Sequence, residues 1–278
     1  MGEAATTQKD YWSSKTYATA ASFVPHFADT LVQSIEFKPT DRVLDIGCGD
    51  GIFTASFAPA VGYVLGVDSS PSMIDSARNL DLKGAVADFR VVDCRHLEQE
   101  EDIINGKWDK VASNAAFHWI LGAPSTRVST LEAIYKSLKP GGTFFFENPG
   151  HGNAPEMQTA IMFALDNHGV PVEEAEAGCP WYYPSDDWMK KTLEKIGFKV
   201  SAIELKPKAL KLTSEMNGGL EGFLRLIGGQ MLDLLLDTEE KKESAMKQMV
   251  RMLRLGTTRE DGTQWITYYS LRCVAIKP

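Results

Sequence analysis

A short apolar strand followed by closely spaced glycines constrains the fold of this chain more than any other stretch. Residues 42–51 read RVLDIGCGDG, and the apolar half of this segment predicts a buried parallel strand. Gly47, Gly49 and Gly51 then let the chain turn sharply and bring its backbone amides close to a ligand. The segment therefore predicts an α/β fold with a cofactor bound where this strand ends.

Two nucleotide-binding interpretations of this loop are weakened by its sequence. A dinucleotide fingerprint needs a third small residue at position 52, where the helix packs on the strand, but the chain has Ile52 there. A P-loop needs a Gly-Lys-Ser/Thr end, and the segment contains no lysine. The spacing Gly-x-Gly-x-Gly, with Asp45 two residues before the first glycine, points to another kind of cofactor.

Four further landmarks follow this loop in order, namely Gly66-Val67-Asp68, Val92-Asp93-Cys94, Ser113-Asn114-Ala115 and Leu138-Lys139-Pro140-Gly141-Gly142. Together with the glycine loop they resemble the S-adenosylmethionine-dependent methyltransferases with a Rossmann-like fold, over residues 40 to 150 and more loosely beyond. The stretch from Ala115 to Trp119 is most similar to the trans-aconitate methyltransferase branch. Length and layout are also similar to fungal small-molecule methyltransferases, including those that S-methylate the dithiol form of gliotoxin.

This resemblance implies a single domain over residues 1–278, with a seven-stranded, mostly parallel sheet and helices on both faces. An N-terminal helical lid is expected over 1–36, the cofactor-binding core over 37–150, and a helical cap over 206–262 before the last strand. A hydrophobic content of 44% is enough for a sizeable core.

Outside the landmarks, the patterns predict the remaining elements and their breaks. Phe144, Phe145 and Phe146 are expected in the core of a strand. Further along, we expect a helix over 155–168, an acidic turn over 172–178, a helix over 187–196 ended by Gly197, strands over 198–205 and 265–275, and two apolar-striped helices between those strands.

The expected cofactor is S-adenosylmethionine. The residues that the resemblance places against it are Tyr17, Asp45, Gly47, Cys48, Gly49, Asp68, Ser69, Met73, Asp93, Cys94, Asn114 and Ala115. Asp68 ends a strand about 20 residues beyond the glycines, where a carboxylate can accept two hydrogen bonds from ribose hydroxyls. The alternatives are that Asp68 caps the helix beginning near Pro71 and that Asp93 belongs to a polar turn.

Aromatic side chains from three parts of the chain are the candidates for the acceptor pocket: Tyr11, Trp12, His118, Trp119, Trp181 and Tyr182. His118 could orient the acceptor or remove its proton, because imidazole titrates near neutrality. The alternative is a half-buried histidine whose hydrogen bonds are satisfied by the backbone. Arg127 and Arg225 are the arginines expected near this pocket.

Charge and cysteine usage limit the partners. A formal net charge of −8 argues against nucleic acid, because phosphate neutralisation needs a basic face, so a small-molecule acceptor is expected. The 4 cysteines lack CxxC spacing and no metal-site spacing occurs, so neither a disulfide framework nor a bound metal is expected. No apolar run approaches membrane-span length, and a cytoplasmic protein is expected. The oligomeric state is left open.

The chemistry of methyl transfer favours an acceptor that is already acidic, because the sequence shows no pair of residues that would serve as a dedicated base. A thiol, with a reference pKa of about 8.5, or a carboxylate meets that condition, whereas an aliphatic alcohol does not. S-methylation of a dithiol secondary metabolite is our preferred hypothesis. Carboxyl O-methylation of a small organic acid is the second, and a non-catalytic cofactor-binding domain that regulates a partner is the third.

Overall fold

The computed structural model describes residues 29–213 and 218–278. Tyr11, Trp12, Tyr17 and most of the expected N-terminal lid lie outside the described residues. The first described element, α3 (Asp29–Ser34), belongs to the helix expected before the glycine loop.

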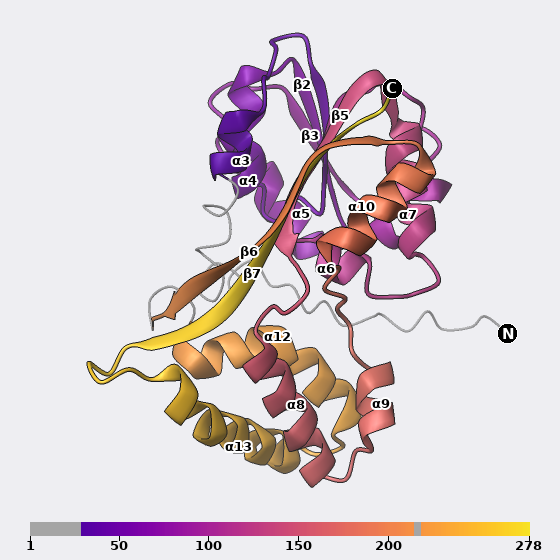
Figure 1. The fold of residues 1–278 in the computed structure, drawn as a ribbon. Helices are drawn as coiled ribbons and strands as arrows, with labels where there is room; N and C mark the ends of the chain where they lie inside the picture. Colours follow the sequence, from indigo (N-terminus) through magenta and orange to yellow (C-terminus); the bar gives the residue numbers. More distant parts are fainter. Residues whose placement is uncertain (1–28, 214–217) are drawn as a thin grey trace, which may run out of the picture.

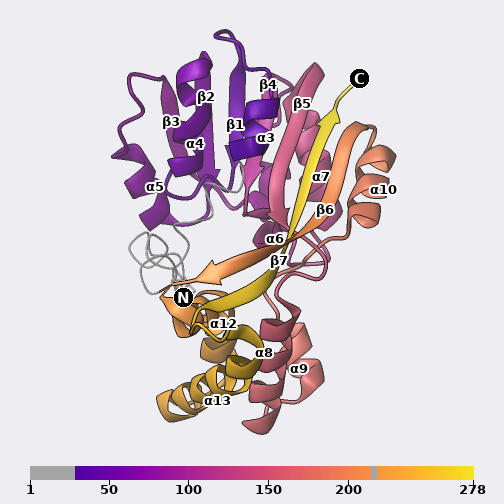
Figure 2. The same cartoon turned by 60° about the vertical axis from the view of Figure 1, so that its left-hand side comes forward.

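One sheet forms the core of the described part of the chain (Figures 1 and 2). Its strands are β1 (Arg42–Ile46), β2 (Tyr63–Asp68), β3 (Ala87–Val91), β4 (Trp108–Asn114), β5 (Leu138–Pro149), β6 (Lys199–Leu212) and β7 (Gln264–Ile276). The order is β3-β2-β1-β4-β5-β7-β6, and β7 runs antiparallel to both of its neighbours. The predicted seven-stranded, mostly parallel sheet is confirmed.

Helices cover both faces of this sheet. One face carries α3, α4 (Ile52–Phe57), the short η1 (Ala58–Ala60) and α5 (Pro71–Arg78), and the other carries η2 (Cys94–Gln99), α6 (Phe117–Ile120), α7 (Arg127–Ser137) and α10 (Asp186–Ile196). The three phenylalanines of β5 serve both faces because side chains alternate along a strand. Phe144 and Phe146 pack toward α7 and α10, Phe145 packs toward α4, and all three are fully buried, as predicted.

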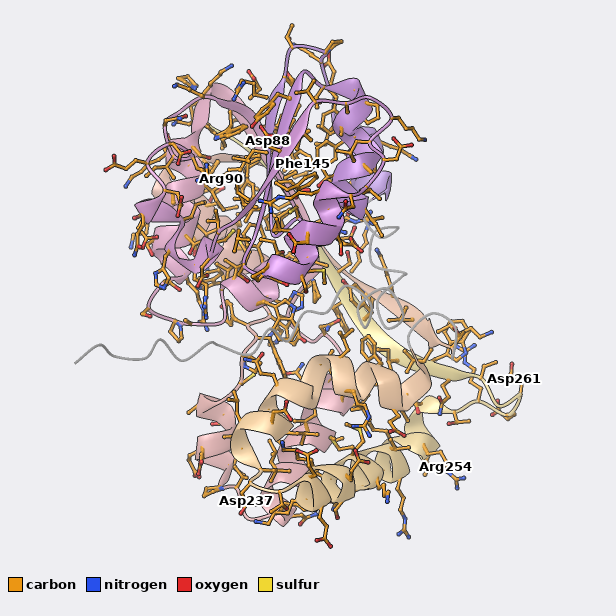
Figure 3. All side chains as sticks on the ribbon, turned by 180° about the vertical axis from the view of Figure 1, so that it is seen from behind. Asp88, Arg90, Phe145, Asp237, Arg254 and Asp261 are labelled. Carbon is orange, nitrogen blue, oxygen red and sulfur yellow. The ribbon has the colours of Figure 1, made fainter. Side chains whose placement is uncertain are left out.

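A helical lobe lies beyond the carboxyl ends of the parallel strands (Figure 1). It contains α8 (Pro155–Asn167), α9 (Val172–Ala177), α12 (Gly219–Leu235) and α13 (Glu239–Thr257), which share an apolar core of their own. Charged residues such as Asp237 and Arg254 lie on its outer surface, whereas Phe145 lies in the sheet (Figure 3). None of the helices in residues 29–213 and 218–278 is both long and apolar enough to cross a membrane.

Two of the predicted elements differ in the structure. Residues 172–177 form the helix α9 instead of an acidic turn, because alanine and glutamate are good helix formers and the segment follows Pro171. Strand β6 continues to Leu212 instead of ending at Leu205. Pro207 lies in this continuation, and β6 is the edge strand of the sheet, where a residue without an N–H group is tolerated.

The long β6–β7 ribbon connects the sheet to the helical lobe (Figure 2). A buried charge cluster fixes the position of this ribbon. The Glu147 side chain, at the end of β5, is 1% exposed and accepts hydrogen bonds from Ser270 Oγ (2.7 Å), Arg272 Nε (2.8 Å) and Lys208 Nζ (3.0 Å). The three donors come from β6 and β7. Because a buried carboxylate needs such partners, the cluster holds the ribbon against the carboxyl end of β5.

Candidate active site

A cavity of about 1410 Å³ lies between the sheet and the helical lobe. Its sheet side is formed by the carboxyl ends of β1, β2, β3 and β4 and the loops that follow them, where open α/β sheets bind their ligands. Its opposite side is formed by α8, α9, α12 and the loop that precedes α10. The cavity is therefore large enough for a cofactor and an acceptor held side by side.

The glycine loop is pinned to the end of β2. The amides of Gly47 and Cys48 both donate to the carbonyl oxygen of Val67, at 2.8 and 3.0 Å, and the amide of Gly49 donates to Asp68 Oδ2 at 3.1 Å. Gly47 and Gly49 have φ values of 70° and 55°, a conformation that side chains disfavour. A Cβ on Gly47 would collide with Ala116, whereas a Cβ on Gly49 would meet nothing within 4 Å.

Asp68 lies in the cavity wall. The alternative role considered for it, capping the helix α5, belongs to Ser70. Ser70 Oγ accepts from the amide of Met73 at 3.2 Å and is the N-cap of α5. Asp68 Oδ1 accepts from the amide of Ser70 at 2.9 Å, so the carboxylate links the glycine loop to the start of α5. The interpretation of Asp68 as the helix cap is wrong.

Asp93 follows β3 and is held by Arg95. Its carboxylate accepts from Arg95 Nη2 at 2.6 Å and from Arg95 Nε at 2.9 and 3.0 Å. Burial would raise the pKa of Asp93, but these hydrogen bonds outweigh it and hold the pKa below its ordinary value. Asp93 also accepts from the amide of Arg95 at the start of η2, as in the polar-turn interpretation, and it lines the cavity.

Asp45 lies beneath the glycine loop and does not line the cavity. Its Oδ2 accepts from Thr54 Oγ1 at 2.6 Å, whereas its Oδ1 is buried without a hydrogen-bond partner in the described part of the chain. Burial raises the pKa of Asp45 to about 7. The Asp68 carboxylate in the cavity wall and the open space at Gly49 suit a ligand that carries hydroxyl donors, so these residues fit the expected cofactor.

The turn after β4 carries Asn114 and Ala115, which were expected at the cofactor, and leads into α6 with His118 and Trp119, which were expected at the acceptor. Ala115 has a φ of 52° and donates its amide to the carbonyl oxygen of Glu147 at 2.8 Å. Such a left-handed alanine costs on the order of 1–3 kcal/mol and is found where the surrounding structure imposes it, often at functional sites. The turn redirects the chain from β4 into α6, so Asn114, Ala115 and Trp119 all reach the cavity wall.

His118 is buried behind this turn and does not line the cavity. Its amide donates to Asn148 Oδ1 at 3.1 Å, and its Nδ1 lies 3.1 Å from the same oxygen. Its ring stacks on Tyr183 with centroids 5.8 Å apart. Burial lowers the pKa of His118 to about 4. The imidazole is therefore neutral at physiological pH.

Trp181 and Tyr182, both expected at the acceptor pocket, lie in different places in the structure. Trp181 lines the cavity and meets Trp119 edge to face, with ring centroids 5.9 Å apart. Tyr182 lies outside the cavity wall, because its ring packs against Trp188 and under the guanidinium of Arg127, 3.6 Å from the ring centroid. Alternate side chains of an extended segment point in opposite directions, which explains the division.

The expected site residues are thus only partly brought together. The cavity wall contains Gly47, Gly49, Asp68, Ser69, Met73, Asp93, Cys94, Asn114, Ala115, Trp119 and Trp181. Asp45, Cys48, His118 and Tyr182 lie just behind it. Arg127 lines the cavity as expected, but the placement of Arg225 near the pocket is wrong, because Arg225 pairs with Glu221 and Glu243 on the exposed side of α12.

Sequence reasoning missed the cavity residues contributed by the helical lobe. Gln158 and Met162 are four residues apart on α8, and Gln230 and Leu234 are four residues apart on α12, so each pair lies on one face of its helix. Val172 and Glu176 repeat this spacing on α9. The spacing was visible in the sequence, but it did not show which helical face meets the cavity.

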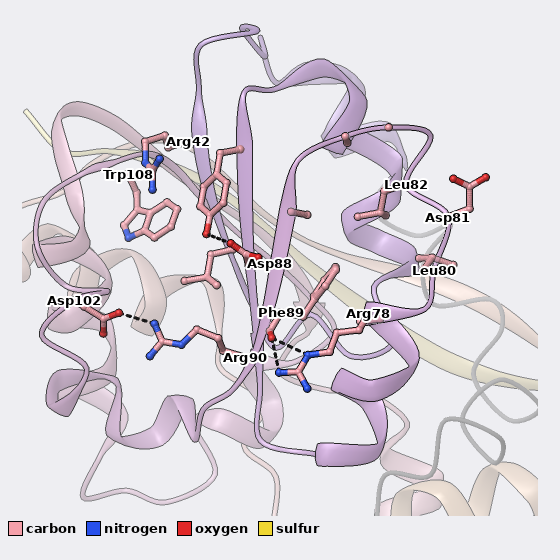
Figure 4. A pocket seen from close by; sticks show the side chains of 16 residues that line it. Arg42, Arg78, Leu80, Asp81, Leu82, Asp88, Phe89, Arg90, Asp102 and Trp108 are labelled. Atoms are coloured by element: carbon pink, nitrogen blue, oxygen red, sulfur yellow. Dashed lines mark hydrogen bonds and ion pairs between the residues drawn. The ribbon is translucent and has the colours of Figure 1, made fainter.

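A second hollow, of about 750 Å³, lies around the β3 edge of the sheet (Figure 4). Its polar groups are largely engaged with one another and with the backbone. Tyr63 Oη donates to Asp88 at 2.9 Å, Arg90 pairs with Asp102 at 2.6 Å, and Arg78 Nη2 donates to the carbonyl oxygen of Phe89 at 2.9 Å. The cavity at the carboxyl ends of the strands is therefore the candidate active site.

Comparison with known proteins identifies the family. Residues 43–142 match the family model described as "Methyltransferase domain". The chain is 31% identical over 272 residues to an uncharacterized methyltransferase of Schizosaccharomyces pombe, which covers 97% of this chain and 99% of that protein. The chain belongs to the class I, S-adenosylmethionine-dependent methyltransferases.

Two further similarities concern parts of the methyltransferase or its fold alone. It is 32% identical to a trans-aconitate 2-methyltransferase of Streptomyces avermitilis over 136 residues, 46% of this chain and 47% of that protein. Its fold is similar to a phosphoethanolamine N-methyltransferase 2 of Haemonchus contortus solved with S-adenosylhomocysteine, with a TM-score of 0.55 at 18% identity, covering 98% of this chain and 59% of that chain. As a member of this family, the present chain uses S-adenosylmethionine as its cofactor.

Replacement of Asp68 tests the cofactor side of the cavity. We expect Asp68→Ala to weaken S-adenosylhomocysteine binding by about 1.5–3 kcal/mol, the range for a hydrogen bond that involves a charged group, as measured by calorimetry. Asp88→Ala, at the β3 edge, is the matched control and should leave the affinity unchanged. An unchanged affinity in folded Asp68→Ala would show that this carboxylate only holds the loop.

Proposed function

We propose that this methyltransferase S-methylates a small, largely apolar molecule that carries thiols, with a dithiol metabolite as the preferred acceptor. The observation that carries the proposal is the character of the cavity on the side of the helical lobe. Trp181 and Met162 supply apolar surface there, next to Trp119 of α6. The polar side chains on that side include the uncharged amides of Gln158 and Gln230, and Glu176 is the one charged side chain that the described residues place there. Such a wall suits a neutral acceptor and excludes water from it.

The chain's own residues bind and orient in this proposal, and do little proton transfer. When bound, S-adenosylmethionine supplies the methyl group and a positive charge that favours the ionised form of a nearby thiol. Asp68 and Asp93 would hold the adenosyl part at the ends of β2 and β3. Ala115 and Trp119 would form the wall between cofactor and acceptor, so alignment is the main catalytic contribution.

A neutral, buried histidine supports an acceptor that ionises without a dedicated base. Because the pKa of His118 is about 4, its imidazole is a weak base for an alcohol or for an ammonium acceptor. We propose that His118 is a positioning residue. Its contacts with Asn148 and Tyr183 tie α6 to the end of β5 and to the loop before α10.

The arginines of the cavity also favour a thiol over a carboxylate. A carboxylate acceptor is usually held by the paired donors of an arginine. Arg95 is bound to Asp93 through both of its fork nitrogens, and Arg127 donates to the carbonyl oxygens of Leu121 at 2.6 Å and Gly122 at 2.9 Å. The cavity wall formed by the described residues contains no other arginine and no lysine.

Carboxyl O-methylation is the second candidate, and the sequence similarity to trans-aconitate 2-methyltransferase favours it. That similarity covers 46% of this chain. Arg127 lines the cavity and is the donor that a carboxylate acceptor would use. The two candidates share the same cofactor and the same requirement for an acidic acceptor.

The decisive experiment is incubation with methyl-labelled S-adenosylmethionine and matched panels of thiols, dithiols and carboxylic acids, followed by mass analysis of the products. We expect label in thioethers, which survive mild alkali. Label that mild alkali releases as methanol would identify methyl esters and favour the second candidate. Transfer to neither panel would contradict both.

The pH dependence of a histidine variant separates the two roles of His118. We expect His118→Ala to lower kcat/KM by a similar factor from pH 6 to pH 9, because a group with a pKa of about 4 keeps one protonation state throughout that range. The exposed His151 provides the control variant, His151→Ala. A defect that shrinks as pH rises, as the thiol ionises by itself, would instead identify His118 as the general base.

A further inference from the structure

Two exposed apolar side chains stand at the rim of the cavity. Val172 of α9 is 43% exposed and Leu234 of α12 is 60% exposed, and both line the cavity. Single exposed apolar residues are common on protein surfaces, and Leu255 of α13, which is 93% exposed and does not line the cavity, is one of them. Val172 and Leu234 differ from Leu255 because they extend the apolar surface of the cavity wall to its outer edge.

That wall can be followed from the sheet to the rim. Trp119 of α6 and Trp181 meet edge to face near the cofactor side of the cavity. Met162 of α8 continues the apolar surface on the lobe side, and Leu234 and Val172 end it at the outside. A ligand that filled this path would cover apolar surface that water otherwise contacts.

Close helix packing holds the path in place. A Cβ on Gly228 of α12 would lie 2.9 Å from Ile161 Cδ1, so α12 lies directly against α8. A Cβ on Gly178, which follows α9, would lie 3.2 Å from Leu235 Cδ1, so the end of α9 packs against the end of α12. The path past Met162, Val172 and Leu234 is therefore lined by three packed helices, α8, α9 and α12.

We propose that the methyl acceptor is amphipathic, with its nucleophile beside Ala115 and Trp119 and a hydrocarbon chain that runs past Met162 to Leu234 and Val172. This rests on the proposed function in one respect, namely that the cavity receives the acceptor, and it holds for a thiol or a carboxylate nucleophile. Glu176 lies on the same wall as Val172, so an anionic group at the far end of the chain is disfavoured. The outer part of the acceptor is therefore uncharged.

Binding of a homologous series tests this inference independently of turnover. The protein, saturated with S-adenosylhomocysteine, is titrated with linear alkanethiols from butanethiol to decanethiol, and in parallel with the corresponding alkanoic acids. Affinity should rise by up to about fourfold for each added methylene that becomes buried. Leu234→Asp should lower the affinity for the long members by about tenfold or more and leave the affinity for the short members unchanged. Because the Leu234 side chain is exposed, its replacement does not disturb the lobe core.

The matched control is Leu255→Asp, which places the same charge on an exposed leucine outside the cavity and should keep the wild-type length dependence. Val172→Asp, on α9, should repeat the effect of Leu234→Asp. A wild-type series with no length dependence, an equal loss in Leu255→Asp, or a change of oligomeric state in Leu234→Asp would overturn the inference. Length-dependent binding without methylation of either series would support the inference and contradict the proposed function.

Discussion

The hydrogen bond from the amide of Gly49 to Asp68 Oδ2 joins the two strands on which the site depends. Gly47 and Cys48 reinforce it by donating to the last carbonyl oxygen before Asp68. These bonds require a left-handed backbone at Gly47 and Gly49, and the approach of Ala116 leaves no room for a side chain at Gly47. The loop, Asp68 and the turn before α6 are thereby fixed as one unit.

A second constraint fixes the helical lobe above this unit. The buried Glu147 carboxylate ties β6 and β7 to the end of β5 through Lys208, Ser270 and Arg272. Its backbone carbonyl also accepts from Ala115, the strained residue at the turn into α6. Glu147 thus connects the turn at the cavity wall with the ribbon that leads to the lobe.

The sequence predicted the sheet side of the site well, for a physical reason. Parallel strands place their carboxyl ends at one edge, so Asp68, Asp93 and Asn114 had to lie close together once their strands were recognised. The lobe side was not predictable in the same way. Which face of α8, α9 or α12 meets the cavity depends on packing between residues far apart in the chain, and Trp181 and Tyr182 point in opposite directions from a segment without regular secondary structure.

The central claim is that the glycine loop, Asp68 and Asp93 form a site for the adenosyl part of S-adenosylmethionine rather than a dinucleotide site. The most direct measurement is calorimetric titration of the full chain with S-adenosylhomocysteine and, separately, with NAD. Saturable binding of S-adenosylhomocysteine, with much weaker or undetectable binding of NAD, is the result the account predicts. Tight binding of NAD without a response to S-adenosylhomocysteine would contradict it.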